Sequence, residues 1–353
     1  MFDFTDTYYL AGMAEQLPSV PSFFLDRYFG ERDTFAQENV LVEIRNGDRK
    51  MAPFVDPNVG NIPVERDGYS MLSFRPPLVA PSRTLTADDL KKRGFGESVL
   101  TNLKPDERAI RIQQKDLIDL DRYIRRREEW MAVQAMTTNG VDVQEYIDAK
   151  TTGRHLPIWY YDFSTGNNPG AYTVSAQWTS FAAMSADVEA MADNLAERGL
   201  PASDLILGAS TWNAVKCFSD LMAMLDNRRV EVGQIAEKYR QFGVTYAGQL
   251  DFNGFVLDVW VSKEKHMDDS GNSVYTFPAK GACVTFPGCG KIYYGAITLI
   301  PYGEKDFVTF EGARIPNLGV DQLHNKKLMI ESSRPLPAPK DFTPWIFAAN
   351  VVA

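Results

Sequence analysis

KPDERAIRIQQKDLIDLDRYIRRREEWMAVQAMTTNG, from Lys104 to Gly140, decides the fold because this stretch predicts one unusually long helix. Its start suits a proline in the first helical turn, and Asn139-Gly140 is a natural left-handed stop. At about 1.5 Å per residue the helix would be a rod roughly 50 Å long. We interpret it as a spine along which an elongated subunit is laid. Its apolar stripe, at spacings of three, four and seven, contains Ile110, Leu117, Leu120, Ile124 and Met131.

A coiled coil is the alternative interpretation of the same stretch. Arg127 and Glu128 interrupt the heptad where an apolar residue is due, which argues against that alternative. The run from Arg125 to Glu129 is assigned to the opposite, charged face of the helix. We therefore expect its paired carboxylates, Glu128 and Glu129, to be solvated.

Composition limits the class of protein. The chain has 353 residues, 44% of them hydrophobic and 24% charged, which is typical of one large or two ordinary globular domains. A formal net charge of -9 argues against a protein that grips nucleic-acid phosphates directly. The sequence lacks a long apolar run and a secretory signal, so we expect no membrane span and synthesis in the cytoplasm. Its three cysteines are an odd number, which favours reduced thiols.

Residues 1–39 form an N-terminal arm rich in aromatic side chains. Pro18 and Pro21 break any long helical pattern, so the aromatic cluster must be buried against some surface. We expect an arm that lies on another subunit, and a short helix in the chain's own core is the open alternative. The predicted intersubunit contacts in the arm are Phe23, Phe24 and Phe29.

Residues 40–92 alternate short strands with turn pairs such as Asn46-Gly47 and Asp67-Gly68, which predicts a long β-hairpin. Its prolines, from Pro53 to Pro81, argue against a central strand pair in a sheet. A two-stranded ribbon alone is marginal in water, so we expect it to lie on a neighbouring subunit. The predicted contacts in this loop are Lys50, Phe54, Gly60, Asn61, Tyr69 and Phe74.

Downstream of the spine, the pattern predicts a hairpin from Val141 to Phe163 that turns at Thr152-Gly153. An α+β region follows, with a helix from Met184 to Arg198 and a second helix for which Ser210 is a suitable N-cap. The last strands, up to Val352, are expected to return beside the spine. Strands are predicted at residues 205–207, 244–249, 255–262, 274–277, 283–286, 327–333 and 345–352.

Signals for catalysis are weak, and we expect no enzyme, no metal and no cofactor. His155, His266 and His324 stand singly, and the spacing of Cys283 and Cys289 does not match a zinc site. The segment 288–291, Gly-Cys-Gly-Lys, lacks the first glycine and the final hydroxyl of a phosphate-binding loop. Ser210 is plausible as a helix cap and poor as a nucleophile. Lys50 invites the idea of a covalent link to an asparagine of a neighbour, but a solvated strand lysine is the simpler interpretation.

Several segments carry a resemblance to a known family. They follow one another as FFLDRYFGERDTF, RKMAPFVDPNVG, GYSMLSFRPPLVAPSRTL, REEWMAVQAM, VTYAGQLDFNGFVLDVW, VYTFPAKGACVTFPG and MIESSRPLPAPKDFTPW. In this order they resemble the major capsid proteins of lambda-like tailed phages, the phage capsid E family, over nearly the whole chain.

The resemblance implies an α+β fold of the Hong Kong 97 (HK97) type. It also implies a non-catalytic subunit that self-assembles through hexamers and pentamers into an icosahedral virion capsid around double-stranded DNA, built in the host cytoplasm. Expected partners are a separate scaffold and protease, a portal, a decoration protein, and DNA as a weakly contacted cargo. No fused N-terminal scaffolding domain is expected, and a decoration protein makes a crosslink through Lys50 less expected. The implied parts are an N-terminal arm (1–39), an extended loop (40–92), a peripheral domain with the spine helix (93–174), an axial domain (175–320) and C-terminal strands that return to the peripheral domain (321–353).

Two other functions remain open. One is another virion component, such as a tail-tube or decoration subunit, although a long spine is foreign to the small β-rich tail-tube subunits. The other is a soluble hydrolase that uses Ser210 or a carboxylate pair. Particle mass separates the shell from the enzyme, because an enzyme is expected to stop at a small symmetric oligomer.

Overall fold

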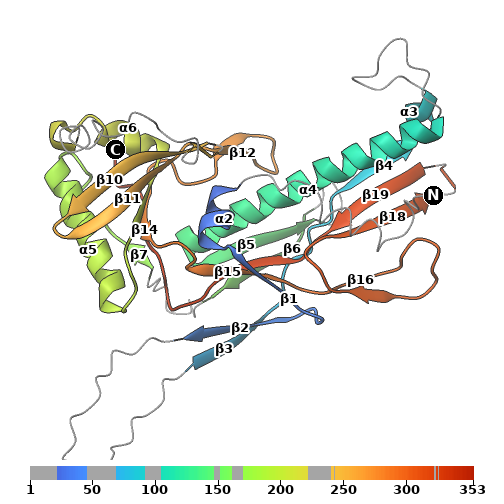
Figure 1. The fold of residues 1–353 in the computed structure, drawn as a ribbon, viewed down its shortest axis with the longest axis horizontal. Helices are drawn as coiled ribbons and strands as arrows, with labels where there is room; N and C mark the ends of the chain where they lie inside the picture. Colours follow the sequence, from blue (N-terminus) through green and yellow to red (C-terminus); the bar gives the residue numbers. More distant parts are fainter. Residues whose placement is uncertain are drawn as a thin grey trace, which may run out of the picture.

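The computed structural model describes residues 22–45, 69–91, 105–146, 152–160, 170–221, 240–241, 243–321, 323–324 and 326–353. Its helices and mostly antiparallel strands form an elongated molecule (Figure 1). One long helix, α4, runs from a group of small sheets at one end to a larger sheet at the other. The α+β class predicted from the sequence is confirmed.

Helix α4 is the predicted spine, and it spans Pro105–Thr138, 34 residues. It ends at Asn139, whose φ of 59° is the left-handed stop that the Asn-Gly pair predicted. The predicted stripe is buried from Leu117 onward, whereas Ile110 is 36% exposed. The C-terminal part of α4 is buried on most sides, through Met131, Ala132, Val133, Ala135 and Met136.

Two three-stranded sheets lie beside α4. In the first, with strand order β18-β19-β4, Leu120 of α4 packs against Leu318 and Met329. In the second, with order β1-β15-β20, β15 pairs in parallel with β1 and antiparallel with β20. The bounds are β1 Glu31–Thr34, β4 Ser82–Thr86, β15 Gly290–Tyr294, β18 Ile315–Asp321, β19 Lys326–Ser332 and β20 Pro335–Pro339. The short helix α3 spans Ala87–Lys91.

Strands β2 (Val40–Arg45) and β3 (Tyr69–Phe74) form a separate antiparallel ribbon that projects from the body (Figure 1). Val40 lies opposite Phe74, and Arg45 lies opposite Tyr69. The predicted hairpin is therefore confirmed at its base, and residues 46–68 lie outside the described residues.

Three further two-stranded sheets complete this half of the molecule and its border with the larger sheet. The hairpin predicted after α4 is formed by β5 and β6, but Thr152 and Gly153 lie inside β6 and not at its turn. The bounds are β5 Gly140–Tyr146, β6 Thr152–Trp159, β12 Lys265–Met267, β13 Ser273–Tyr275, β16 Ile297–Leu299 and β17 Val308–Phe310.

The larger sheet has seven strands in the order β7-β21-β14-β8-β11-β10-β9. Helix α5 buries Met184, Val188 and Met191 in one cluster with residues of this sheet. The bounds are α5 Phe181–Glu197, α6 Ala209–Val215, β7 Ala171–Tyr172, β8 Asp204–Gly208, β9 Arg240–Gln241, β10 Val244–Phe252, β11 Phe255–Ser262, β14 Ala282–Thr285 and β21 Ile346–Ala348.

Three details differ from the sequence-based expectations. β21 hydrogen-bonds to β14 and β7 inside the seven-stranded sheet and contacts α4 from there, whereas β19 and β20 belong to the three-stranded sheets beside the spine. β18, which contains the expected domain limit at residue 320, pairs with the strands beside α4. Ser210 is not the N-cap of α6, because Gly208 occupies that position.

Candidate functional site

The candidate site is the junction where the short helix α2 (Phe23–Tyr28) meets α4 and the seven-stranded sheet (Figure 1). The rings of Phe24 and Phe277 stack with their centroids 5.9 Å apart. The arm aromatics are almost fully buried, with exposed fractions of 3% for Phe23, 0% for Phe24 and 1% for Phe29. Helix α2 is therefore part of the subunit's own core.

In this conformation Phe23, Phe24 and Phe29 pack within their own chain, and their contact with a neighbouring subunit stays a prediction. The alternative, a short helix tucked into the chain's own core, is the one that the structure adopts. Burial of apolar rings stabilises either arrangement, and the sequence alone does not distinguish them.

The other predicted contact residues belong to the extended loop. Lys50, Phe54, Gly60 and Asn61 lie outside the described residues. The backbone of Tyr69 pairs with Arg45 in the β2–β3 ribbon. Phe74 is half-buried, and its ring lies edge-on to Tyr160 with centroids 5.6 Å apart.

Glu129 of α4 holds the start of α2. Its two carboxyl oxygens accept hydrogen bonds from the backbone N–H groups of Phe24 and Leu25, both at 2.9 Å. These N–H groups lie in the first turn of α2, where they have no partner within the helix. Glu129 is 3% exposed, and burial raises its pKa to about 8 although the two N–H groups act to lower it.

A second carboxylate fixes the other side of α2. Asp204, at the start of β8, accepts hydrogen bonds from Arg27 Nε at 2.5 Å and Arg27 Nη2 at 2.9 Å. The hydroxyl of Tyr28 donates to the same carboxylate at 2.9 Å. Because carboxyl groups of α4 and of the large sheet both hydrogen-bond to α2, this short helix joins the two halves of the subunit.

A third cluster lies between α4 and the strands beside it, around Arg314. Its Nε donates to Asp121 Oδ1 at 2.8 Å, and its remaining nitrogens bind Glu128, which also accepts from the hydroxyl of Tyr294 at 3.1 Å. Glu331 of β19 is 0% exposed, and neither carboxyl oxygen has a hydrogen-bond partner among the described residues. Burial raises the pKa of Glu331 to about 8, and the neighbouring Asp121 acts in the same direction.

The expectation that Glu128 and Glu129 are solvated is therefore wrong, since they are 0% and 3% exposed. Glu128 follows Ile124 by four residues and precedes Met131 by three, so it falls on the buried stripe of α4. The heptad interruption at Glu128 was thus the available signal. A carboxylate on an apolar face needs a buried cationic partner, but the sequence does not say that this partner is Arg314.

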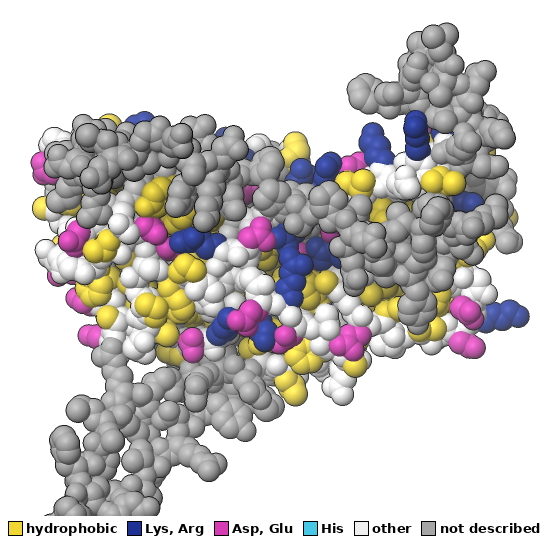
Figure 2. All heavy atoms as spheres, in the orientation of Figure 1, with side chains coloured by type: hydrophobic (Ala, Val, Ile, Leu, Met, Phe, Trp, Pro, Cys, Tyr) yellow, Lys and Arg dark blue, Asp and Glu magenta, His cyan; other side chains and the backbone are white. Residues whose placement is uncertain are grey.

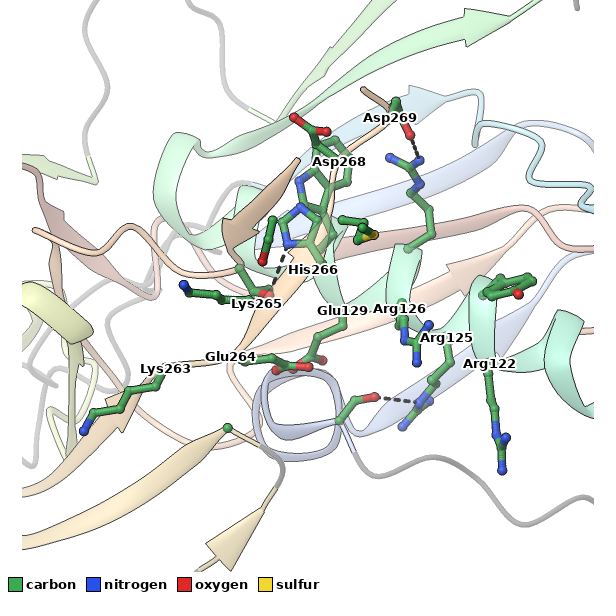
Figure 3. Close-up of a pocket in the computed structure, with 18 residues that line it drawn as sticks. Arg122, Arg125, Arg126, Glu129, Lys263, Glu264, Lys265, His266, Asp268 and Asp269 are labelled. Atoms are coloured by element: carbon green, nitrogen blue, oxygen red, sulfur yellow. Dashed lines mark hydrogen bonds and ion pairs between the residues drawn. The ribbon is translucent and has the colours of Figure 1, made fainter. Parts of the chain in front are cut away.

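A pocket of about 1180 Å³ opens beside the junction. It is lined by Ser22 before α2, by residues between Lys263 and Thr276 in the segment that carries β12 and β13, and by seven residues of α4: Arg122, Tyr123, Arg125, Arg126, Arg127, Glu129 and Trp130. Arg122, Arg125 and Arg126 project from α4 to the same side (Figure 3). On the face drawn in Figure 2, lysine and arginine side chains gather near the middle of the molecule. We call the pocket lined by these residues the α4 pocket.

The histidines and cysteines are the side chains most often used for catalysis or metal binding. His155 pairs with Asp142 and His324 with Asp321, both at the surface, and His266 is within 3.2 Å of the Thr276 hydroxyl. Over the described ranges, no group of three or more His, Cys, Asp or Glu residues is placed to hold a metal ion. Cys217, Cys283 and Cys289 are free thiols, and burial raises the pKa values of the last two. None of the helices in these ranges is both long and apolar enough to cross a membrane.

Comparison with known proteins points to one family. The sequence model of that family, described as phage major capsid protein E, matches residues 6–350. A prophage protein of E. coli CFT073, assigned as a capsid protein, is 19% identical, with a TM-score of 0.68 over 99% of both chains. A phage-related protein of Bordetella bronchiseptica RB50 is 13% identical, with a TM-score of 0.52 over 98% of both chains. No curated protein matches this chain.

Proposed function

Because the chain belongs to the phage major capsid protein E family, we propose that its copies assemble as hexamers and pentamers into an icosahedral shell around double-stranded DNA. The family match over residues 6–350 carries this conclusion. The protein is a shell-forming subunit of the tailed-phage type, and its fold is the HK97-type capsid fold that the sequence segments implied. Its role is structural, and we propose that it has no catalytic activity.

The β2–β3 ribbon supports a contact between subunits. It is a two-stranded sheet that pairs with no third strand among the described residues, and an isolated ribbon is marginal in water. A neighbouring subunit would supply the surface that the ribbon lacks. We therefore keep Lys50, Phe54, Gly60, Asn61 and Tyr69 as proposed contacts. Phe74 is proposed as a contact only through the part of its surface that solvent still reaches.

The division of the chain into an arm, a loop and domains is also a proposal. The arm would extend to residue 39, the loop to 92, the peripheral domain to 174 and the axial domain to 320, followed by the C-terminal strands. The pairing of β18 with β19 favours moving the last limit to the start of β18. Scaffold, portal and decoration proteins are the proposed partners, and assembly is proposed to take place in the host cytoplasm before the capsid becomes part of the virion.

Deleting the loop tests this function. In the variant, residues 46–68 are replaced by an Asn-Gly turn, so that the β2–β3 pairs from Val40 to Phe74 can still form. We expect a folded subunit that no longer forms shells, measured by negative-stain microscopy and sedimentation, with urea unfolding as the check on folding.

A control variant carries a Gly/Ser segment of equal length in place of residues 46–68. It should also fail to form shells if the loop side chains make the contact. Particles of normal size from the deletion variant would contradict the proposed role of the loop. A wild-type chain that stays a small oligomer would contradict the shell itself.

A further inference from the structure

The α4 pocket holds exposed cations that form no ion pair among the described residues, although the charge of Arg126 acts on the carboxyl group of Glu264. Arg126 and Lys263 line it, both are exposed, and neither forms an ion pair with another described residue. Arg122 has an ion pair with Asp119 one turn earlier on α4, at 3.6 Å, and its side chain is 52% exposed. Such a pair contributes little and leaves the guanidinium available.

Three of the four acidic residues that line the pocket, Glu129, Asp268 and Asp269, accept hydrogen bonds from other groups. Asp269 Oδ1 accepts a hydrogen bond from Arg127 at 2.5 Å, and Asp268 accepts from the backbone N–H of Asn272 at 2.7 Å. Glu129 holds the start of α2 as described above. Burial raises the pKa of Glu264 as well as that of Glu129, while the charge of Arg126 acts to lower the pKa of Glu264.

The cations are placed on two walls of the pocket. Arg122 and Arg126 are one helical turn apart on α4, and Lys263 and Lys265 come from the chain between β11 and β13 (Figure 3). The Lys265 ammonium lies 4.5 Å above the ring of Tyr275, which leaves its charge unneutralised. Figure 3 shows Glu129 and Glu264 between the arginines and the lysines, so the cations flank the two carboxyl groups from both sides.

We propose that the α4 pocket is a contact point for nucleic-acid phosphates, an inference that rests on the proposed function because that function encloses DNA. Guanidinium and ammonium groups bind phosphate oxygens well, and phosphate contacts need charge more than a shaped apolar cleft. A chain with net charge -9 repels DNA over most of its surface, so the pocket would confine contact to one place per subunit.

The test compares binding of a labelled mixed-sequence DNA duplex to the full-length unassembled chain, by fluorescence anisotropy over a salt series. The double variant Arg126→Gln/Lys263→Gln should bind about tenfold more weakly at low salt, and the slope of log K against log salt should fall by about 2, one unit per lost phosphate contact. Neither side chain has an ion pair within the described structure, so the variant should retain the unfolding midpoint of the wild type.

The matched control is Arg154→Gln/Lys305→Gln, which changes the net charge equally at exposed positions outside the pocket. It should leave the salt slope unchanged, and an equal loss in both variants would overturn the proposal. Poly-L-glutamate is a second probe. If it binds as tightly as DNA, and loses that binding in the pocket variant, the pocket takes an acidic protein segment and the proposal is wrong.

Microscopy of the same preparations separates this inference from the proposed function. Shells that form normally, while the pocket variant keeps the wild-type salt slope, would refute the DNA contact alone. Failure of the wild-type chain to form shells would refute the function, and the anisotropy result would still decide the phosphate site.

Discussion

Arg314 binds Glu128 with both terminal nitrogens, Nη1 to Oε1 at 2.7 Å and Nη2 to Oε2 at 2.9 Å. The carboxylate is fully buried, so this bidentate pair is a contact between α4 and the chain just before β18 that water does not reach. Two parallel charge-assisted hydrogen bonds fix both the distance and the orientation of the two groups. The pair thereby sets how the strands sit beside the spine.

Removing one partner of this pair should be costly. Glu128→Ala leaves Arg314 buried with Asp121 as its remaining carboxylate partner, and we expect the free energy of unfolding of the unassembled subunit to fall by about 3–5 kcal/mol. Urea unfolding measures this change. The double variant Glu128→Leu/Arg314→Leu should recover much of the loss, because it removes both charges. Arg75→Ala, at a side chain that is 63% exposed, is the control and should change stability by at most about 1 kcal/mol.

Glu129 should make stability depend on pH. Its pKa in the folded chain is about 8, above the ordinary value of 4.5, so the folded state holds this proton more tightly than the unfolded state does. The stabilisation is complete below about pH 4.5 and is lost as the pH rises through about 8. The unfolding free energy of the wild type should therefore fall relative to that of Glu129→Gln across this window, by up to about 1.4 kcal/mol per pH unit.

Parallel urea titrations of the two proteins at several pH values check this prediction. Other titrating groups are common to both proteins and cancel in the difference. Glu331 shifts in the same direction, so the variant should keep part of the dependence. Identical pH profiles would contradict the prediction, because they would show that folding does not shift the pKa of Glu129.

The burial of Phe24 decides what its substitution does. Phe24→Ala opens a cavity in a fully buried aromatic cluster and should lower the unfolding free energy of the subunit by about 3–5 kcal/mol. Phe307→Ala removes a ring that is 76% exposed, and it should stay within about 0.5 kcal/mol of wild type. A Phe24 variant that folds normally but does not assemble would instead place this ring at an intersubunit contact.

Gly140 is the first residue of β5, two positions after the end of α4, and there is no room for a side chain there. A Cβ at this position would lie 2.2 Å from the indole of Trp159 and 2.5 Å from the carbonyl oxygen of Ile158. Gly140→Ala should destabilise the subunit by about 1–3 kcal/mol, because part of that clash is with backbone. Gly30→Ala is the control, since its nearest new contact is an ordinary 3.4 Å from Asp26 O. Thermal unfolding of both variants distinguishes a local clash from a general intolerance of alanine.

Local patterns predicted much of the fold. The spine, its left-handed stop at Asn139 and the strand from Phe255 to Ser262 all lie where spacing and turn residues place them. These features depend on neighbours within a few positions. The place of β21 between β14 and β7 does not, because a short apolar strand fits beside the spine or inside the sheet equally well.

The candidate site was harder to predict because its partners are distant in sequence. Glu129 reaches Phe24 across 105 positions, and Arg314 reaches Glu128 across 186. A run of arginines and glutamates on a helix usually marks a solvated face. Only the position of Glu128 within the apolar stripe pointed to a buried carboxylate, and that position says nothing about the partner.

The sheet that pairs β1 with β15 has a consequence for how fast the subunit folds. The ion pair between Lys340 and Glu31, at 2.7 Å, spans 309 positions of the chain. Long-range pairings of this kind slow folding, because the entropy of closing a long loop is lost before the contact compensates for it. We therefore expect freshly made chains to acquire their final form slowly, so that the supply of competent subunits sets the pace at which particles accumulate.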